Sequence, residues 1–572
     1  MKNLITLLIF ISCLITVAQN QLLIPTTIES TNINLTLQNG THQFFAGENT
    51  ATMGANGNVL GPTLILNNGD DLNINVTNNL GEPTTIHWHG LHISAENDGG
   101  PHTIIQPNTT WNPQFTVDNK AATYWYHPHL IDKTDEHVSN GLAGLIIIRD
   151  AEEAALDLPR TYGVDDIPLV IQTKDFDAGF QIVHPTNNDD TVMVNATVDP
   201  MVDVPAQVVR LRLLNGSSQR TFNFGFSGNL TFYQIATDGG LKESPVALTR
   251  LRLSNGERSE ILVDLTGMQG QTLQLMSYAS ELQNGINGAT FPGASTSMVL
   301  DNYNPNPLNG TDFNILQLNV IAQTANPVTT IPNSLVTITP YLESDSDFTR
   351  NFSLSSVIGG LDALNGDFTI NNVSMDMNVI NVTIPLGNTE IWSIQNGTPS
   401  AHPFHIHDIQ FNILDVDGNP PAAYLEGWKD TILLRPGQVI NVITKFDDFA
   451  DETIPFMYHC HMLTHEDGGM MGQFVVVDEG AGVNDFDLEN GFSLFPNPSN
   501  GVYMSAKLTD QNDRITAYAI INELGQIVNY HKIHENEMNN LYSFPVFELS
   551  TGSYMLRIFS ENNIYTKRFI KK

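Results

Sequence analysis

Apolar and polar side chains alternate along much of the chain, in short runs that end at turn-forming residues. Residues 72–76 alternate Leu, Ile and Val with Asn, residues 208–214 end at an Asn-Gly pair, and residues 390–394 end at Gln-Asn-Gly. A two-residue period bounded by Asn and Gly predicts short β-strands that bury one face. Because the three strand endings are similar, we interpret them as one β-sandwich repeated three times.

The pattern therefore predicts an all-β fold: three consecutive β-sandwich domains over residues 19–155, 160–325 and 345–480, and a small C-terminal β-sandwich over residues 490–572. A chain of 572 residues is long enough for several separate cores. Its net charge of -36 argues against nucleic acid as a partner, because phosphate contacts need clustered Lys and Arg.

Residues 1–18 carry Lys2 and then an apolar run that is too short to span a membrane, which predicts a cleaved export signal and no transmembrane segment. Cys13 lies in this run, but the residues before it make a poor lipobox, so we expect removal and not lipidation. The exported chain then holds one cysteine, Cys460, and no intramolecular disulfide is possible. We expect a secreted or cell-surface protein that passes through the periplasm.

The stretch around Cys460 has the highest concentration of possible metal ligands in the chain. Residues 458–470 hold one thiol, three imidazoles and two thioethers, and a trigonal His2Cys set with a weak axial Met is typical of a blue copper site. In an extended strand Cys460 would face one way while His459 and His461 face the other, so one strand could serve two metal centres. A buried inert cysteine is the alternative, and imidazoles on both sides disfavour it.

Four His-x-His pairs are the second signal. They are His87/His89, His127/His129, His405/His407 and His459/His461. Eight imidazoles are too many for a mononuclear site but suit a cluster of three metal ions shared between two domains; imidazole suits copper, although zinc and iron also accept it. His402, His465 and Met470 would then complete the blue site with Cys460. The middle repeat holds only His184, so we expect it to bind no copper and to act as a spacer.

These motifs resemble the copper signatures of the multicopper oxidases, in particular the three-domain bacterial branch that includes laccases and periplasmic copper-tolerance oxidases. The resemblance covers roughly residues 35–480, and segments outside the ligands support it: Asp98-Gly99-Gly100-Pro101, Gly141-Leu142-Ala143-Gly144, Asp166-Ile167-Pro168 and Gly427-Trp428-Lys429-Asp430. It implies that the three sandwiches are cupredoxin-like. It also implies four copper ions, with O2 and a small reducing substrate as reactants.

The resemblance assigns a role to each ligand. His402, Cys460, His465 and Met470 would form the type 1 centre, with Met471 a less favoured axial ligand. His87 and His405 would hold the type 2 copper. His89, His127, His129, His407, His459 and His461 would hold the type 3 pair. Reduction of O2 also needs protons, and Glu466 and Asp98 match acidic residues that the family uses as proton relays; the alternative for each is a solvated surface carboxylate.

The chain departs from the copper-tolerance oxidases in its thioethers. Those relatives carry a Met-rich insertion, and an Asp and a Met upstream of the first type 1 His; here residues 320–370 hold no Met, and Thr398 and Ser400 occupy the upstream positions. Thioethers favour Cu(I), and Met375 and Met377 are better explained as apolar filler. We therefore expect a laccase-like oxidase of phenols or aromatic amines, with a cuprous or ferrous oxidase in copper tolerance as the alternative.

The motifs disfavour two further classes of protein. Some relatives have lost their coppers and serve as structural or division proteins, but every ligand position is filled here. A copper nitrite reductase would not need all eight imidazoles. We expect a monomer.

The C-terminal segment has its own signature. Phe495-Pro496-Asn497-Pro498, the turn at 551–554 and the basic last residues resemble the sorting domain of type IX secretion cargo, from about Phe492 to the end. The alternative is an ordinary extra β-domain. The resemblance implies carriage across the outer membrane by secretion machinery, usually with removal of the domain.

Overall fold

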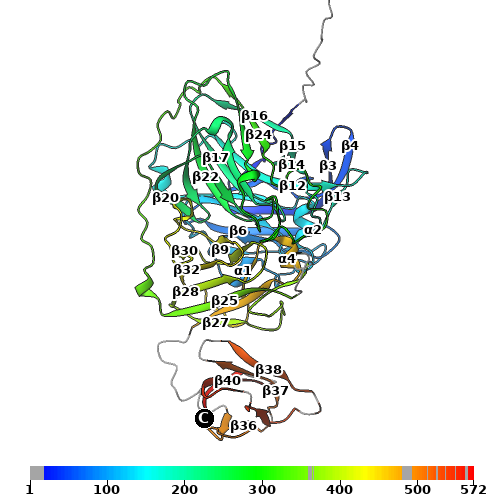
Figure 1. The fold of residues 1–572 in the computed structure, drawn as a ribbon, viewed down its shortest axis with the longest axis vertical. Helices are drawn as coiled ribbons and strands as arrows, with labels where there is room; N and C mark the ends of the chain where they lie inside the picture. The colour runs from blue at the N-terminus through cyan, green and yellow to red at the C-terminus, as the bar shows by residue number, and fades with distance from the viewer. Residues whose placement is uncertain are drawn as a thin grey trace, which may run out of the picture.

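The structure, a computed structural model, describes residues 19–357, 364, 366–478 and 492–572, apart from residues 512, 523–525, 535, 537, 548 and 561–563. The expected signal segment at 1–18 lies outside the described residues. The described part consists of β-sheets with a few short helices, so the all-β prediction is confirmed (Figure 1). None of its helices has the length and apolar character of a membrane-spanning segment.

The first sandwich carries two of the four His-x-His pairs. One sheet has the order β2 (Thr27–Ile28), β5 (Thr63–Asn67), β11 (Gly144–Arg149), β10 (Ala122–His127) and β7 (His87–His89). The other has the order β4 (Glu48–Ala55), β3 (Asn32–Phe45), β6 (Asp71–Asn79) and β8 (Thr110–Trp111), with β9 (Gln114–Thr116) also on β6.

The middle sandwich lies at the top of Figure 1. Its first sheet has the order β1 (Asn20–Gln21), β16 (Pro200–Pro205), β24 (Phe313–Ile321), β23 (Thr272–Ser277), β18 (Phe222–Phe226) and β21 (Leu251–Leu253). Its second has the order β15 (Thr197–Val198), β14 (Thr191–Val194), β12 (Asp166–Phe176), β17 (Val208–Asn215), β22 (Arg258–Asp264), β19 (Phe232–Thr237) and β20 (Gly240–Leu248), with β13 (Ile182–Val183) on β12. The first described strand of the chain thus belongs to a sheet of the middle sandwich.

The third sandwich and the C-terminal domain follow below it (Figure 1). The third has the sheets β26 (Phe368–Ile370), β25 (Phe348–Ser356), β28 (Thr389–Asn396), β32 (Val439–Lys445), β30 (Asn412–Val416), and β27 (Val382–Pro385), β34 (Met471–Val477), β33 (Phe456–Cys460), β29 (His402–Ile406), β31 (Thr431–Leu434). The C-terminal sheets are β35 (Phe492–Phe495), β36 (Tyr503–Leu508), β39 (Leu541–Pro545), and β38 (Ile527–Lys532), β37 (Ile515–Asn522), β40 (Gly552–Ser560), β41 (Ile564–Lys571).

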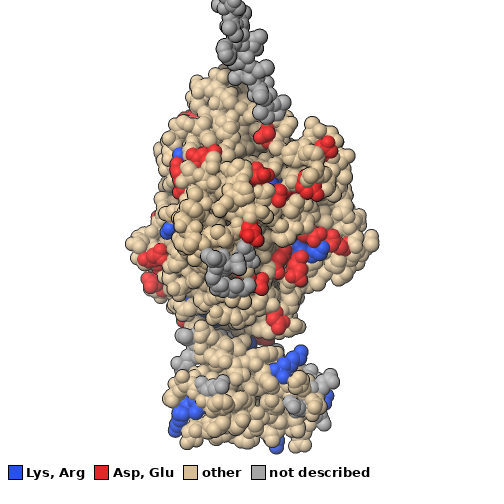
Figure 2. Space-filling model, turned by 45° about the vertical axis from the view of Figure 1, so that its right-hand side comes forward, with Lys and Arg blue, Asp and Glu red and all other residues tan. Residues whose placement is uncertain are grey.

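The helices are short connections between strands. They are α1 (Ala95–Asp98), α2 (Thr134–Ser139), α3 (Ala151–Ala154) and α4 (Leu463–Asp467), with 3-10 turns η1 (Ser227–Asn229), η2 (Ala279–Glu281), η3 (Glu343–Asp345) and η5 (Ala423–Leu425). Each sandwich and the C-terminal domain has an apolar core of its own. Acidic side chains are spread over the visible face of the main body, and Lys and Arg side chains are visible on the C-terminal domain (Figure 2).

The three predicted strand endings are equivalent in the structure. β6, β17 and β28 each pair in parallel with one neighbour and antiparallel with the next. Each is closed by a fully buried asparagine, namely Asn78, Asn215 and Asn396. In all three, the side-chain oxygen accepts the N–H two residues on, and the side-chain NH2 donates to one local and one distant carbonyl oxygen. A repeated local bonding scheme explains why the same residue ends the strand in each repeat.

Candidate metal centres

Three side chains of the third sandwich converge at its surface-facing end. His402 begins β29, Cys460 ends β33 and His465 lies on α4. The Cys460 Sγ lies 3.5 Å from His402 Nδ1 and 3.7 Å from His465 Nδ1, and the two nitrogens are 3.2 Å apart. The three atoms thus form a small triangle of one sulfur and two imidazole nitrogens, which is the donor set of a blue copper site.

The surroundings hold these donors in orientation. The outer nitrogen of His402, Nε2, lies 2.7 Å from Thr398 Oγ1 and 3.3 Å from Ser400 Oγ, which leaves Nδ1 facing the sulfur. Phe368 packs against both imidazoles, with ring centroids 4.7 and 4.5 Å away. The candidate axial ligand Met470 is fully buried. Its backbone N–H donates to the His465 carbonyl oxygen, and its carbonyl oxygen accepts the Cys460 N–H.

Two triads of imidazoles lie between the first and third sandwiches. In one, the Nε2 atoms of His129, His407 and His459 are 3.1 to 3.2 Å apart. In the other, the Nδ1 of His89 lies 3.4 Å from His127 Nε2 and 3.2 Å from His461 Nε2. Each triad combines residues from both sandwiches, so neither forms without the interface.

His87 and His405 occupy the third position of this cluster. Their outer Nδ1 atoms are hydrogen-bonded to the carbonyl oxygens of Asp98 and Asp430, at 3.0 and 2.8 Å. Their Nε2 atoms are buried and have no hydrogen-bond partner among the described residues. Buried ring nitrogens normally have a hydrogen-bond partner. The two Nε2 atoms without one lie beside the two triads, so their lone pairs are available to bind an additional group. A metal ion is such a group.

The structure brings together the residues that the sequence pattern singled out. Cys460 faces His402 and His465, whereas its neighbours His459 and His461 join the two triads on the other side of the strand, as the two-residue period predicted. The strand itself ends at Cys460, and the following residues turn into α4. His184 lies outside both sites, near Asn140.

Burial keeps the candidate histidine ligands neutral, which is the form that binds a metal, but it disfavours the thiolate form of Cys460. Burial, helped by neighbouring imidazoles, lowers the pKa of His459, His129 and His89 well below the usual range, so each ring is neutral and carries a lone pair. Burial lowers the pKa of His465 to about 4. Burial raises the pKa of the Cys460 thiol well above its usual range, so the thiolate form needs a cation beside it.

Two buried carboxyl groups contact different imidazoles of the cluster. The Glu466 oxygens lie 3.3 Å from His129 Nδ1 and 3.3 Å from His459 Nδ1, and burial and neighbouring carboxylates raise the pKa of Glu466 well above its usual range. Asp98 Oδ2 accepts a hydrogen bond from His407 Nδ1 at 2.8 Å. Burial would raise the pKa of Asp98, but the imidazoles of His87 and His407 outweigh it and hold the pKa far below the usual range.

Sequence reasoning missed several residues that contact the candidate ligands. Asp430 lies 3.2 Å from His89 Nε2 and is itself paired with Arg258 of the middle sandwich. Asp430 entered the sequence analysis only as the last residue of the segment Gly427-Trp428-Lys429-Asp430. Arg258 could not be recognised, because no sequence feature of its strand indicates a contact with another domain. Phe368 was also missed.

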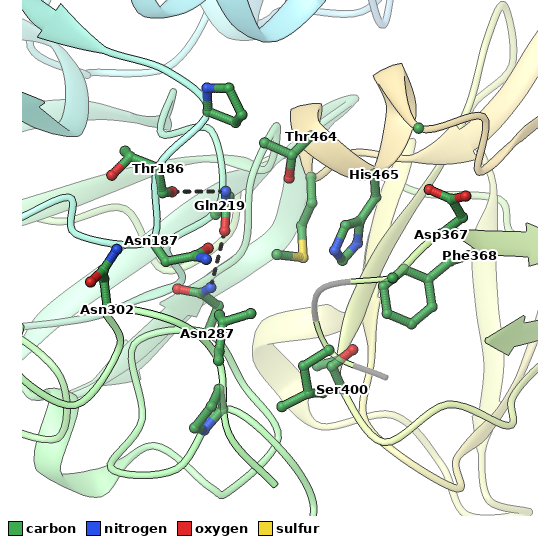
Figure 3. A pocket seen from close by; sticks show the side chains of 18 of the residues that line it. Thr186, Asn187, Gln219, Asn287, Asn302, Asp367, Phe368, Ser400, Thr464 and His465 are labelled. Atoms are coloured by element: carbon green, nitrogen blue, oxygen red, sulfur yellow. Dashed lines mark hydrogen bonds between the residues drawn. The ribbon is translucent and has the colours of Figure 1, made fainter. Parts of the chain in front are cut away.

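A cavity of about 440 Å³ opens beside the type 1 candidates. His465, Ser400 and Phe368 line one wall, and residues of the middle sandwich line the other (Figure 3). That second wall is rich in amides: Gln219 donates to the Thr186 carbonyl oxygen at 3.0 Å, and Asn287 donates to Gln219 Oε1 at 3.5 Å. Asp175, Asp367 and Met462 also line the cavity.

Family models match three segments of the chain. Residues 36–153 and residues 339–480 match models described as multicopper oxidase. Residues 493–572 match a secretion system C-terminal sorting domain, which confirms the interpretation of the tail.

Whole-length relatives and solved structures agree with these matches. The multicopper oxidase mco of Staphylococcus haemolyticus is 34% identical over 476 residues, which cover 80% of this chain and 93% of the relative. The cell division protein FtsP of Sodalis glossinidius is 33% identical over 474 residues, covering 80% and 93%. The structure of a bacterial laccase-like multicopper oxidase CueO from Ochrobactrum sp. is 34% identical, with a TM-score of 0.69, covering 80% of this chain and 100% of that one. A multicopper oxidase from Campylobacter jejuni, described as a metallo-oxidase, is 26% identical with a TM-score of 0.68, covering 81% and 96%.

Proposed function

Since the chain belongs to the multicopper oxidase family, an oxidoreductase family that uses oxygen, we propose that it is a laccase-like oxidase of phenols or aromatic amines. A type 1 copper would supply the one-electron acceptor for the substrate, and a trinuclear copper cluster would supply the site at which O2 is reduced to water. The four coppers, when bound, supply the one-electron redox chemistry. His402, Cys460, His465 and Met470 would hold the first, and the eight paired imidazoles would hold the other three.

The chain itself provides the connection between the two centres. Cys460 is covalently bonded to His459 and His461, one in each triad, so an electron that enters at the sulfur needs no mobile carrier. His459 has a second contact with Cys460, because its Nδ1–H donates to the Cys460 carbonyl oxygen at 3.0 Å. All three residues are buried, so water is kept away from this short covalent path.

Glu466 and Asp98 are the proposed proton relays. Both Glu466 oxygens are buried beside the His129 and His459 rings, and burial raises the pKa of Glu466, so the group can hold a proton next to these rings. Asp98 accepts a hydrogen bond from His407, and its other oxygen lies 3.3 Å from His87 Nδ1. Glu466, whose pKa is raised, can donate a proton as a general acid, whereas Asp98, whose pKa is lowered, is a carboxylate that can accept a proton and pass it on.

The amide-rich cavity is the main observation in favour of an organic substrate. A phenol or aromatic amine needs a cavity with hydrogen-bonding groups and an aromatic wall, and Gln219, Asn287 and Phe368 supply these beside His465. A metal-ion substrate would need a cluster of carboxylates or thioethers. Among the described residues, the groups of three or more possible metal ligands lie in the copper sites and not on the amide wall. The Ochrobactrum relative, which acts on lignin model compounds, supports this choice.

Oxidation of Cu(I) or Fe(II) is the second candidate, because Asp175, Asp367 and Met462 also line the cavity and the Campylobacter relative is a metallo-oxidase. Oxygen uptake by the copper-loaded full chain, measured with phenols, aromatic amines, Cu(I) and Fe(II), decides between the two. We expect the largest kcat/KM for an organic substrate. A higher kcat/KM for Cu(I) or Fe(II) would assign the metal-ion reaction instead.

The C-terminal sorting domain supports export of the enzyme through the cell envelope. We propose that the exported form starts after residue 18, works at the cell surface or in the medium, and is a monomer. The proposed domain limits are those of the sequence analysis: residues 19–155, 160–325, 345–480 and 490–572.

A further inference from the structure

The middle sandwich, expected to be a copper-free spacer, reaches the trinuclear site through the turn between β21 and β22. Gly256 of this turn has φ +80°, and a Cβ built on it would lie 2.9 Å from the His461 ring. The backbone of the middle sandwich therefore lies directly against a proposed ligand, where no side chain would fit.

Two residues further on, Arg258 uses every N–H of its guanidinium. Nε donates to the Thr123 carbonyl oxygen in the first sandwich at 3.1 Å. Nη1 donates to the Gly256 carbonyl oxygen at 3.0 Å and to Asp430 Oδ1 at 2.7 Å. Nη2 donates to the Asp238 carbonyl oxygen at 3.0 Å and to Asp430 Oδ2 at 2.5 Å. A side chain that is 0% exposed and fully hydrogen-bonded has one geometry, and it joins all three sandwiches.

Asp430, whose carboxylate is bound by the Arg258 guanidinium, contacts two imidazoles of the cluster. Its Oδ1 lies 3.2 Å from His89 Nε2, and its carbonyl oxygen lies 2.8 Å from His405 Nδ1. Both oxygens accept, so the protons sit on these outer nitrogens, and the lone pairs of His89 Nδ1 and His405 Nε2 face the cluster. The two rings are stacked, with centroids 3.8 Å apart and planes 10° apart.

The glycine of the His-Trp-His-Gly motif belongs to the same arrangement. Gly90 has φ +85°, and a Cβ there would lie 2.5 Å from Asp430 Oδ2 and 2.7 Å from Arg258 Nη2. The Arg258–Asp430 pair thus fills the space next to the motif.

We propose that Arg258 is a positioning residue of the trinuclear site, which acts through Asp430 to hold His89 and His405 in the tautomer and orientation that bind metal. The middle sandwich is then a working part of the oxygen-reducing centre and not a spacer. This inference rests on the proposed function, because it takes His89 and His405 as copper ligands.

Lysine is the informative replacement. It keeps the positive charge, but it has three donors on one nitrogen and cannot reproduce the planar two-nitrogen grip on a carboxylate. Arg210 provides the matched control. It is also a buried arginine of the middle sandwich, on β17 next to β22, and it pairs with Glu153 and Glu260 and not with Asp430.

The experiment compares the full chain with Arg258→Lys, Asp430→Asn and Arg210→Lys after copper loading. The readouts are copper per chain, the electron paramagnetic resonance signal of type 2 copper, the blue band of type 1 copper, and copper release to a chelator. In Arg258→Lys we expect the cluster copper to bind about 10- to 100-fold more weakly, which is the usual effect of losing a group that orients ligands. The blue band should stay at full intensity, and kcat should fall while KM for the reducing substrate stays unchanged.

Each other outcome has a definite meaning. Wild-type copper affinity in Arg258→Lys and Asp430→Asn, or an equal loss of cluster copper in Arg210→Lys, would overturn the positioning role. A blue band that falls in parallel with the type 2 signal would do the same, since it would indicate general loosening. If Arg258→Lys does not accumulate as folded protein, Asp430→Asn alone decides. A wild-type chain that binds only one copper would instead refute the proposed function.

Discussion

At the scale of single residues, the ring nitrogen that faces away from the cluster decides which nitrogen faces it. His407 Nδ1 is bound by the Asp98 carboxylate and His127 Nδ1 by the Pro128 carbonyl oxygen, so both turn Nε2 inward. Among the six imidazoles of the two triads, His89 alone turns Nδ1 inward, because Asp430 takes its Nε2. The acceptors outside the ligands therefore select each tautomer.

Cys460→Ser tests whether electrons enter through the Cys460 sulfur. A serine hydroxyl replaces the sulfur with little change in volume, so the fold should persist, but a hydroxyl is not the soft thiolate that a blue copper site requires. We expect loss of the blue band and of turnover, with unchanged far-ultraviolet circular dichroism. The visible spectrum and oxygen uptake of the copper-loaded variant measure this. Retained turnover would contradict the path through Cys460.

Glu466→Gln tests the proton relay separately from the electron path. Glutamine fills the same space but carries no acidic proton, so the step that delivers protons to oxygen should slow by about 100-fold or more. Reduction of the type 1 centre by substrate without oxygen should be unaffected. Stopped-flow measurement of the two half-reactions distinguishes them. Equal slowing of both halves would indicate damage to the ligands and not loss of a relay.

At the scale of elements, the closing asparagine of each repeat explains what local sequence could predict. The alternation in residues 72–76 and the Asn that follows depend on neighbours within a few residues, so both were visible in the sequence. The end of β33 at Cys460 and the start of α4 were not, because this change of direction depends on packing against the first sandwich, where the Thr134 and Asp135 N–H groups donate to Asp467.

Replacing these asparagines should destabilise one repeat at a time. Asn215→Ala removes the hydrogen bonds of Asn215 to the Leu253 carbonyl oxygen and the Ser217 N–H, which costs about 1 to 3 kcal/mol for each group left unsatisfied, while the Arg220 carbonyl oxygen still accepts from Asn255. Asn396→Ala should also weaken the blue band, because Asn396 fixes Thr398, which hydrogen-bonds His402. Denaturant unfolding and the visible spectrum measure the two effects. Asn215→Ala is the control for the spectrum, and a blue band weakened equally in both variants would contradict the local explanation.

At the scale of the whole molecule, contacts between distant segments were beyond sequence analysis. Arg258 and Asp430 are separated by 172 positions and lie in different sandwiches. Periodicity reports the local element and its buried face, but not which domain meets that face. The His-x-His pairs could be predicted as one cluster only because metal chemistry demanded that the eight imidazoles meet.

The His92 contact between the first and third sandwiches gives a pH dependence. His92 lies 2.8 Å from Asp408 Oδ1 and 3.0 Å from Asp448 Oδ2. Burial lowers its pKa, but the two carboxylates outweigh burial and raise the pKa of His92 well above its usual value. Burial also raises the pKa of Asp408 to about 6, so the ion pair with Asp408 forms above that pH.

Since the folded-state pKa of His92 is raised, the stabilisation that it gains from ionised Asp408 is fully present between about pH 6 and the unfolded pKa of about 6.5, and it is lost as pH rises through the folded pKa. The stability difference between wild type and His92→Gln should be about 2 kcal/mol just above pH 6 and should shrink in alkali. Thermal unfolding across this range measures it. His42→Gln is the control, because burial lowers the pKa of His42, which hydrogen-bonds a backbone carbonyl oxygen. A difference that grows with pH would contradict the assignment.

The C-terminal domain should be separable from the oxidase. It has its own apolar core, and its Arg557 makes a hydrogen bond of 3.5 Å to Thr383 of the third sandwich, a weak tie between two independently packed units. A chain that ends at Asp478 should therefore keep its blue band, its melting temperature and its kcat/KM, while export to the cell surface or medium is lost. Fractionation of cells that carry the secretion system, together with thermal unfolding of the purified oxidase, tests both halves. A large fall in melting temperature would mean that the tail also stabilises the copper-binding domains, and export without the tail would mean that another segment of the chain directs it.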